Sequence, residues 1–172
     1  MELNAITQPT PADKYDADIA ILKDASRLHL WRDTENQHRN FSTILEKLTR
    51  QWTGCGDVEQ APPSLDVDLT CPIPHFNRTE DGLGHIYMDK YSVVTLLHEF
   101  GHFIELDEAE CVIYSEWVFA NAFPVSFSRL ERDARGYLCK PGTGVAAPVF
   151  YNTGEYGLAN TDSPATINTE TM

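Results

Sequence analysis

Residues 91–102 read Tyr-Ser-Val-Val-Thr-Leu-Leu-His-Glu-Phe-Gly-His. Apolar side chains recur in it at three- and four-residue spacings, which is typical of an α-helix with a buried face. We therefore predict a central helix at about Lys90–Ile104, with Asp89 as its N-cap. Residues four apart lie one above the other on a helix, so His98 and His102 can reach the same metal ion.

Glu99 directly follows His98, so its carboxylate can point at a metal-coordinated water instead of at the metal. This arrangement suits hydrolysis, because the metal polarises the water and a carbonyl group while the carboxylate carries the proton to the leaving group. Gly101 would let a neighbouring element approach the helix closely. The sequence therefore predicts a metal centre with His98 and His102 as ligands and Glu99 as the catalytic general base.

Catalytic zinc usually takes three protein ligands and a water, so a third ligand is expected in the segment that follows. Glu108 ranks first, because it lies six residues after His102, which fits a tight turn that returns the next helix over the metal. Glu110 ranks second and would need a longer turn. Glu116 ranks third. It shares a stripe with apolar residues, so it would be either a buried ligand or a partner for a histidine N–H.

The chain before the central helix predicts helices first and short strands later. Residues 15–52 carry two helical patterns, broken near residues 33–40. Residues 54–84 are rich in Pro, Gly and Asp, which predicts loops with at most short strands, such as residues 65–69. The β-branched and aromatic residues of His85–Asp89 predict a brief strand.

After the central helix, a further helix is expected at Asp107–Ala122, ended by Pro124. We predict one domain at residues 15–140, preceded by a flexible arm at residues 1–14 and followed by a loop-rich, partly disordered tail at residues 141–172. The expected fold is a compact α+β domain, in which the histidine helix packs against the next helix and a small sheet borders the cleft.

The composition of the chain excludes several classes of function. The 172 residues include 13 Lys and Arg against 26 Asp and Glu, a net charge of −13, so we expect no direct binding of nucleic acid. Neither a secretory signal nor an apolar run of membrane-spanning length is present, which predicts a cytoplasmic protein without membrane contact. The four cysteines show no metal-binding spacing and are expected to be free thiols: Cys55, Cys71, Cys111 and Cys139.

Three features resemble the zincin metallopeptidases: the segment Leu96–His102, the acidic residue Glu108, and an aromatic-rich following helix at Tyr114–Phe119. Within that superfamily, the chain is similar to the short metallopeptidases carried by bacterial plasmids and phages. The resemblance covers about Ile86–Pro124. It implies a minimal zincin-like fold and a zinc-dependent, peptidase-like hydrolase that acts on a peptide or protein.

By the same resemblance, the two histidines bind zinc, Glu99 is the general base, and a glutamate of the next helix completes the ligand set. The chain departs from the metzincin pattern, because Glu105 and Glu108 stand where its turn glycine and third histidine would be. Met172 is the only methionine after the motif, so no Met-turn is expected.

Two details of the site and one alternative function remain open. An extended substrate would lie alongside an edge strand, for which His85–Asp89 is the natural candidate. Donors to an oxyanion could come from four residues, among which spacing does not choose: His85, Tyr87, Tyr151 and Tyr156. The alternative is a non-catalytic binding or regulatory protein with a zincin fold, in a mobile-element or defence setting. The intact Glu99 argues against it, because a structural metal site needs no general base.

Overall fold

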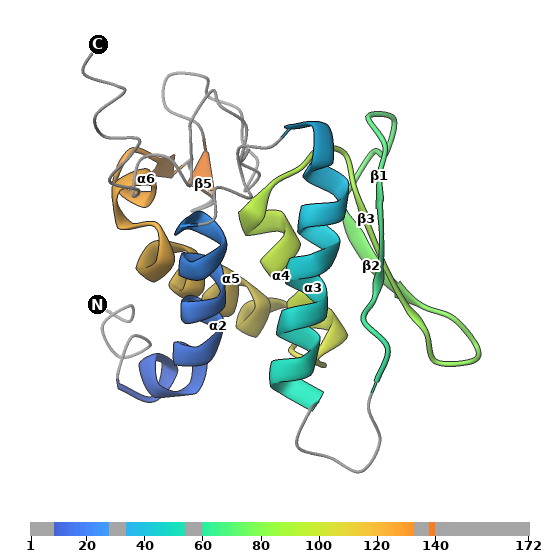
Figure 1. Cartoon of the computed structure of the whole chain (residues 1–172), viewed down its shortest axis with the longest axis horizontal. Coiled ribbons are helices and arrows are strands. Elements are labelled where there is room, and N and C mark those ends of the chain that lie inside the picture. The colour runs from blue at the N-terminus through green and yellow to red at the C-terminus, as the bar shows by residue number, and fades with distance from the viewer. Residues whose placement is uncertain (1–8, 28–33, 54–59, 133–137, 140–172) are drawn as a thin grey trace.

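The histidine helix and the strand before it form the middle of the molecule (Figure 1). The computed structural model describes residues 9–27, 34–53, 60–132 and 138–139. In chain order the elements are α2 (Pro9–Arg27), η1 (Thr34–Asn36), α3 (Gln37–Thr53), β1 (Ser64–Val67), β2 (His75–Arg78), β3 (Gly84–Met88), α4 (Val93–Phe103), α5 (Glu108–Ala122), α6 (Pro124–Ser128), β4 (Glu131–Arg132) and β5 (Leu138–Cys139). Within these residues, five helices accompany a small mixed sheet, which confirms the α+β class.

The mixed sheet has the strand order β1-β3-β2. The central strand, β3, pairs parallel with β1 and antiparallel with β2. Its side chains alternate: Ile86 and Met88 are fully buried, whereas His85 and Tyr87 lie on the other face. The buried face joins the core that α4 also lines, so the sheet has one apolar and one polar face.

The helices pack in layers beside this sheet. Figure 1 shows α3 and α4 next to the sheet, with α2 and α5 beyond them. One stripe of α3 is fully buried, because its apolar residues recur at helical spacing: Phe41, Ile44, Leu45 and Leu48. Helices α4 and α5 form the most extensive contact between elements, and α2 packs on α5 from the other side. No helix among the described residues is both long and apolar enough to cross a bilayer.

Two helices start at residues that differ from the predicted ones. Helix α2 begins at Pro9, so the predicted arm at residues 1–14 overlaps it from residue 9 onward. The predicted N-cap of α4, Asp89, is wrong: Ser92 caps the helix, and its hydroxyl accepts a hydrogen bond from the Thr95 N–H at 3.2 Å. The predicted tail at residues 141–172 lies outside the described residues.

A buried carboxylate ties α2 to α3 and α5. Asp18 is 1% exposed, and its Oδ2 accepts hydrogen bonds from Trp52 Nε1 at 2.8 Å and from the Tyr114 hydroxyl at 2.7 Å. Its other oxygen, Oδ1, is buried and has no hydrogen-bond partner among the described residues. Burial raises the pKa of Asp18, and the two donated hydrogen bonds oppose that shift. The carboxyl therefore positions three helices but is costly to ionise.

Substitutions of Asp18 should separate the contribution of its hydrogen bonds from the cost of its ionisation. We expect Asp18→Ala to destabilise the fold by about 1–3 kcal/mol for each donor left unpaired in the core. Asp18→Asn keeps an acceptor for Trp52 and Tyr114 and should be far milder. A carboxyl whose pKa is raised by folding holds its proton more tightly in the folded state. Wild-type stability should therefore fall as the pH rises from the usual carboxyl pKa through the raised one, and Asp18→Asn should lack this component. Urea unfolding at several pH values measures both effects.

Candidate metal centre

The turn between α4 and α5 sets the geometry of the site. The Leu106 N–H bonds to the Gly101 carbonyl and the Glu105 N–H to the His102 carbonyl, both at 3.0 Å. These two bonds form a Schellman motif with Glu105 in the left-handed position, at φ 69°. Glycine is the usual residue there, since a side chain is strained in this conformation. The tight turn returns the chain at once, so α5 runs back along α4.

Helix α5 starts with a capping box. The Asp107 carboxylate accepts a hydrogen bond from the Glu110 N–H at 2.8 Å, and the Glu110 carboxylate accepts one from the Asp107 N–H at 2.9 Å. Glu110, the second-ranked third ligand, is thereby engaged at the helix terminus and does not contact the histidines. The capping box also fixes where α5 begins, which places Glu108 in the first turn.

His98, His102 and Glu108 converge. His98 Nε2 lies 2.9 Å from Glu108 Oε2, and His102 Nε2 lies 3.2 Å from Glu108 Oε1. In α4, every residue except the two histidines is buried, so both imidazoles emerge together from an otherwise enclosed helix. The Glu108 carboxylate is 73% exposed and covers the imidazoles from the solvent side. The first-ranked residue among the three glutamates is the one that meets both histidines.

The charge and burial of the groups around His98 and His102 suit the binding of a cation. Burial lowers the pKa of His98, although Glu108 opposes the shift, so the imidazole favours its neutral, metal-binding form. Burial and, secondarily, the charge of Glu108 raise the pKa of Glu99 to about 7. Glu99 is only 5% exposed. A positive ion at the imidazoles would offset the repulsion between these two carboxylates.

Sequence reasoning missed Cys111, which also lies at the site. Its Sγ and one ring nitrogen from each of His98 and His102 all lie within 4.8 Å of one another, close enough to hold a metal ion together. Cys111 is fully buried, and burial followed by the charge of Glu108 raises its pKa to about 12. The signal in the sequence was its position three residues after Glu108, on the same face of α5.

The third-ranked ligand, Glu116, pairs with an arginine of β4. Arg132 Nη2 lies 2.7 Å from Glu116 Oε1, and Nη1 lies 3.3 Å from Oε2, so the guanidinium binds both carboxylate oxygens. Glu116 contributes to the potential at His98 but has no contact with either histidine among the described interactions. It therefore acts as the partner of Arg132.

The sheet differs from the cleft expected from the sequence. Strand β3 is paired on both sides, so the prediction that it is an edge strand beside an extended substrate is wrong. His85 hydrogen-bonds Ser64, and Tyr87 stacks on His75, all on the polar face turned away from the core. This position argues against His85 and Tyr87 as oxyanion donors. The other candidates, Tyr151 and Tyr156, lie outside the described residues.

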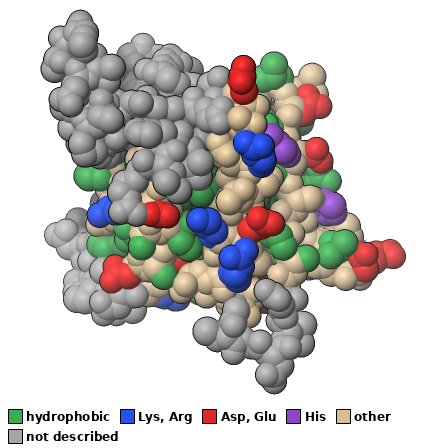
Figure 2. Space-filling model, viewed as in Figure 1, with side chains coloured by type: hydrophobic (Ala, Val, Ile, Leu, Met, Phe, Trp, Pro, Cys, Tyr) green, Lys and Arg blue, Asp and Glu red, His purple; other side chains and the backbone are tan. Residues whose placement is uncertain are grey.

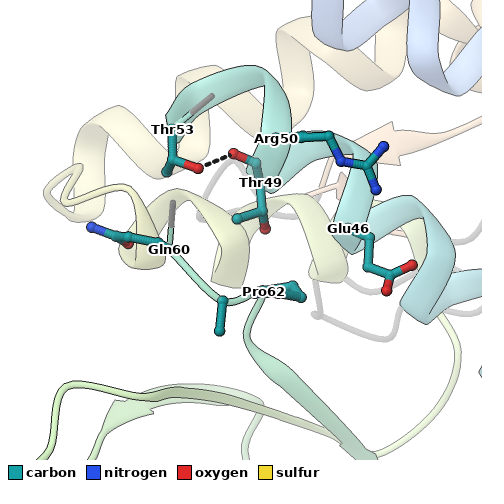
Figure 3. Close-up of a pocket in the computed structure, with 7 residues that line it drawn as sticks. Glu46, Thr49, Arg50, Thr53, Gln60 and Pro62 are labelled. Atoms are coloured by element: carbon teal, nitrogen blue, oxygen red, sulfur yellow. Dashed lines mark hydrogen bonds between the residues drawn. The ribbon is translucent and has the colours of Figure 1, made fainter. Parts of the chain in front are cut away.

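A cavity of about 280 Å³ lies elsewhere, between the end of α3 and the segment before β1 (Figure 3). Its threonines are engaged with their own helix, since the Thr49 and Thr53 hydroxyls donate to the Leu45 and Thr49 carbonyls at 2.7 Å. The lining contains neither histidine nor cysteine: Glu46, Thr49, Arg50, Thr53, Gln60, Ala61 and Pro62. The cavity therefore has no part in the histidine site.

Comparisons with known proteins found no match: no family model fits the sequence, and no curated protein or solved structure is significantly similar to it.

The close contact between α4 and α5 can be tested at Gly101. A Cβ added there would lie 2.7 Å from Cys111 Sγ, so Gly101→Ala should destabilise the fold by about 1–3 kcal/mol. In a Cys111→Ala background the nearest atoms are the Cβ and Cα at position 111, at 3.3 and 3.4 Å, so the same change should cost clearly less stability. Equal effects in both backgrounds, measured by urea unfolding, would contradict the contact.

Proposed function

We propose that this protein is a zinc-dependent, peptidase-like hydrolase. The observation that carries the proposal is the convergence of His98, His102 and Glu108, with the buried carboxylate of Glu99 next to it in sequence. Two imidazoles and a carboxylate are a common donor set of catalytic zinc, and three protein ligands leave a position for water. A His-Glu-x-x-His motif, in which a general base lies between two metal ligands, suits hydrolysis better than a structural site, which needs no base.

The donors present fit zinc. Both ring nitrogens face the same carboxylate at 2.9 and 3.2 Å, so a small movement apart would admit an ion at Zn–N and Zn–O distances of about 2.0–2.2 Å. The two histidines are held by a helix whose other residues are buried, so their positions are preorganised. When bound, zinc would supply Lewis acidity, lowering the pKa of a coordinated water and polarising a carbonyl.

Each residue then has a defined task. Glu99 takes the proton of the attacking water at its carboxylate and returns it to the leaving amine. Its burial keeps bulk water away from the carboxylate. Glu108 holds the third ligand position at the start of α5. His98 and His102 fix the direction from which a carbonyl group could approach.

We propose that the substrate is a peptide or protein and that the protein acts in the cytoplasm. Free thiols at Cys71 and Cys111 suit a reducing compartment. On the face seen in Figure 2, Lys and Arg side chains are interspersed with Asp and Glu, and those drawn form no continuous basic area. This surface, together with the net charge of −13, favours a neutral or basic peptide over nucleic acid.

Zinc affinity should depend on Glu108 and not on Glu110. We expect His98→Ala and Glu108→Gln each to weaken zinc binding by more than about tenfold, because even outer partners of a zinc site cost about 10–100-fold. Glu110→Gln is the matched control, since glutamine preserves the capping box and should leave affinity within about twofold. Competition with a chromophoric chelator measures the affinities. Equal effects of the two glutamine substitutions would contradict the assignment.

Hydrolysis should depend on Glu99 without requiring it for zinc binding. Zinc-loaded wild type should cleave members of an unstructured peptide mixture, with products identified by mass spectrometry. Glu99→Gln should retain zinc and lose about 10²–10⁴-fold in rate. Undiminished cleavage by Glu99→Gln would refute its role as base. A zinc-loaded wild type that binds peptides without cleaving them would support the alternative, a non-catalytic binding protein.

A further inference from the structure

The metal site has a fourth donor on its buried side. Cys111 lies three residues after Glu108 on α5, so both side chains project from the same face towards α4. Its sulfur and the ring nitrogens of His98 and His102 fall within 4.8 Å of one another. Among the described residues, the Cys111 thiol makes one polar contact, a weak hydrogen bond that it donates to the Leu106 carbonyl at 3.6 Å. The sulfur is therefore available to a metal.

Cys111 and Glu108 reach the imidazoles from different depths. Glu108 is 73% exposed and covers the pair from solvent, whereas Cys111 has no exposed surface and packs on Gly101. Around a helix, Gly101 lies about 60° from His98 on one side and Glu99 about 100° on the other. Sulfur thus approaches from the side opposite to the proposed base. The Glu108 carboxylate and the Cys111 thiol therefore reach the two imidazoles from different sides.

We propose that Cys111 is the fourth protein ligand of the metal, which gives a closed His98, His102, Glu108 and Cys111 coordination sphere in the resting protein. This inference rests on the proposed function. The thiol would lose its proton to solvent as the metal–sulfur bond forms. A thiolate in the set favours zinc over magnesium, calcium and manganese, which prefer oxygen donors.

The reach is short. In a tetrahedral zinc site the ligand atoms lie roughly 3.3–3.7 Å apart, given Zn–N of about 2.0–2.1 Å and Zn–S of about 2.3 Å. The sulfur therefore needs to close by about 1 Å, which rotation of the cysteine side chain can supply while the backbone stays on Gly101. Water could enter such a sphere only when one ligand leaves. Rotation of Cys111 back to its present position would free that place and leave the His98, His102 and Glu108 set of the proposed function.

Cobalt substitution tests the assignment without relying on activity. The protein would be loaded with Co²⁺, whose visible absorption reports coordination geometry and whose intense near-ultraviolet charge-transfer band reports a thiolate ligand. Wild type should show both features. Cys111→Ser and Cys111→Ala should keep the visible absorption and lose the charge-transfer band. Cys71→Ser, at a described free cysteine in the β1–β2 connection, is the matched control and should keep both.

The outcomes separate this inference from the proposed function. Cobalt that binds wild type without a charge-transfer band, or with a band that survives both substitutions at Cys111, would overturn thiolate ligation and leave the His98, His102 and Glu108 site standing. Cobalt and zinc that fail to bind folded wild type would overturn both. Circular dichroism establishes that each variant is folded, and the wild-type band is informative even if a variant is not.

Discussion

The close packing of α5 against α4 at Gly101 is the constraint on which the site depends. The sulfur of Cys111 occupies space that any larger residue at position 101 would need. The left-handed turn at Glu105 makes this approach possible, because it reverses the chain within a few residues. The capping box at Asp107 then sets where α5 begins. Together these features bring Glu108 over both histidines, so local backbone geometry determines which glutamate meets them.

The rest of the fold holds that pair of helices in place. Helix α4 packs against α5 and the sheet, and its two partly accessible residues are the histidines. On the far side of α5, Tyr114 donates its hydroxyl proton to Asp18 of α2, which also accepts a hydrogen bond from Trp52. Hydrogen bonds require a defined direction, so the two bonds to the buried Asp18 fix how the three helices lie relative to one another. Apolar contacts alone would allow the helices to shift along one another. The N-terminal helices therefore support the site without contributing to it.

Much of this arrangement could be predicted from the sequence, because it follows local patterns. Helical spacing placed His98 and His102 on one face, and the six-residue separation favoured Glu108 over Glu110 before any geometry was known. The N-cap was misplaced because Asp89 and Ser92 are both good caps, and the choice depends on the chain path after β3. The order of the strands could not be predicted, since pairing partners far apart in the chain leave no local pattern. Cys111 was missed because a single cysteine looks like any buried apolar residue until α5 is docked on α4.

Zinc ligation by His98, His102 and Glu108 can be tested with a crystal structure of the zinc-loaded protein, with anomalous diffraction recorded on both sides of the zinc edge. Bound zinc should give one strong anomalous peak at about 2.0–2.2 Å from His98 Nε2, His102 Nε2 and a Glu108 oxygen. A peak at another location, or histidines that remain hydrogen-bonded to Glu108 with no peak between them, would contradict this ligation.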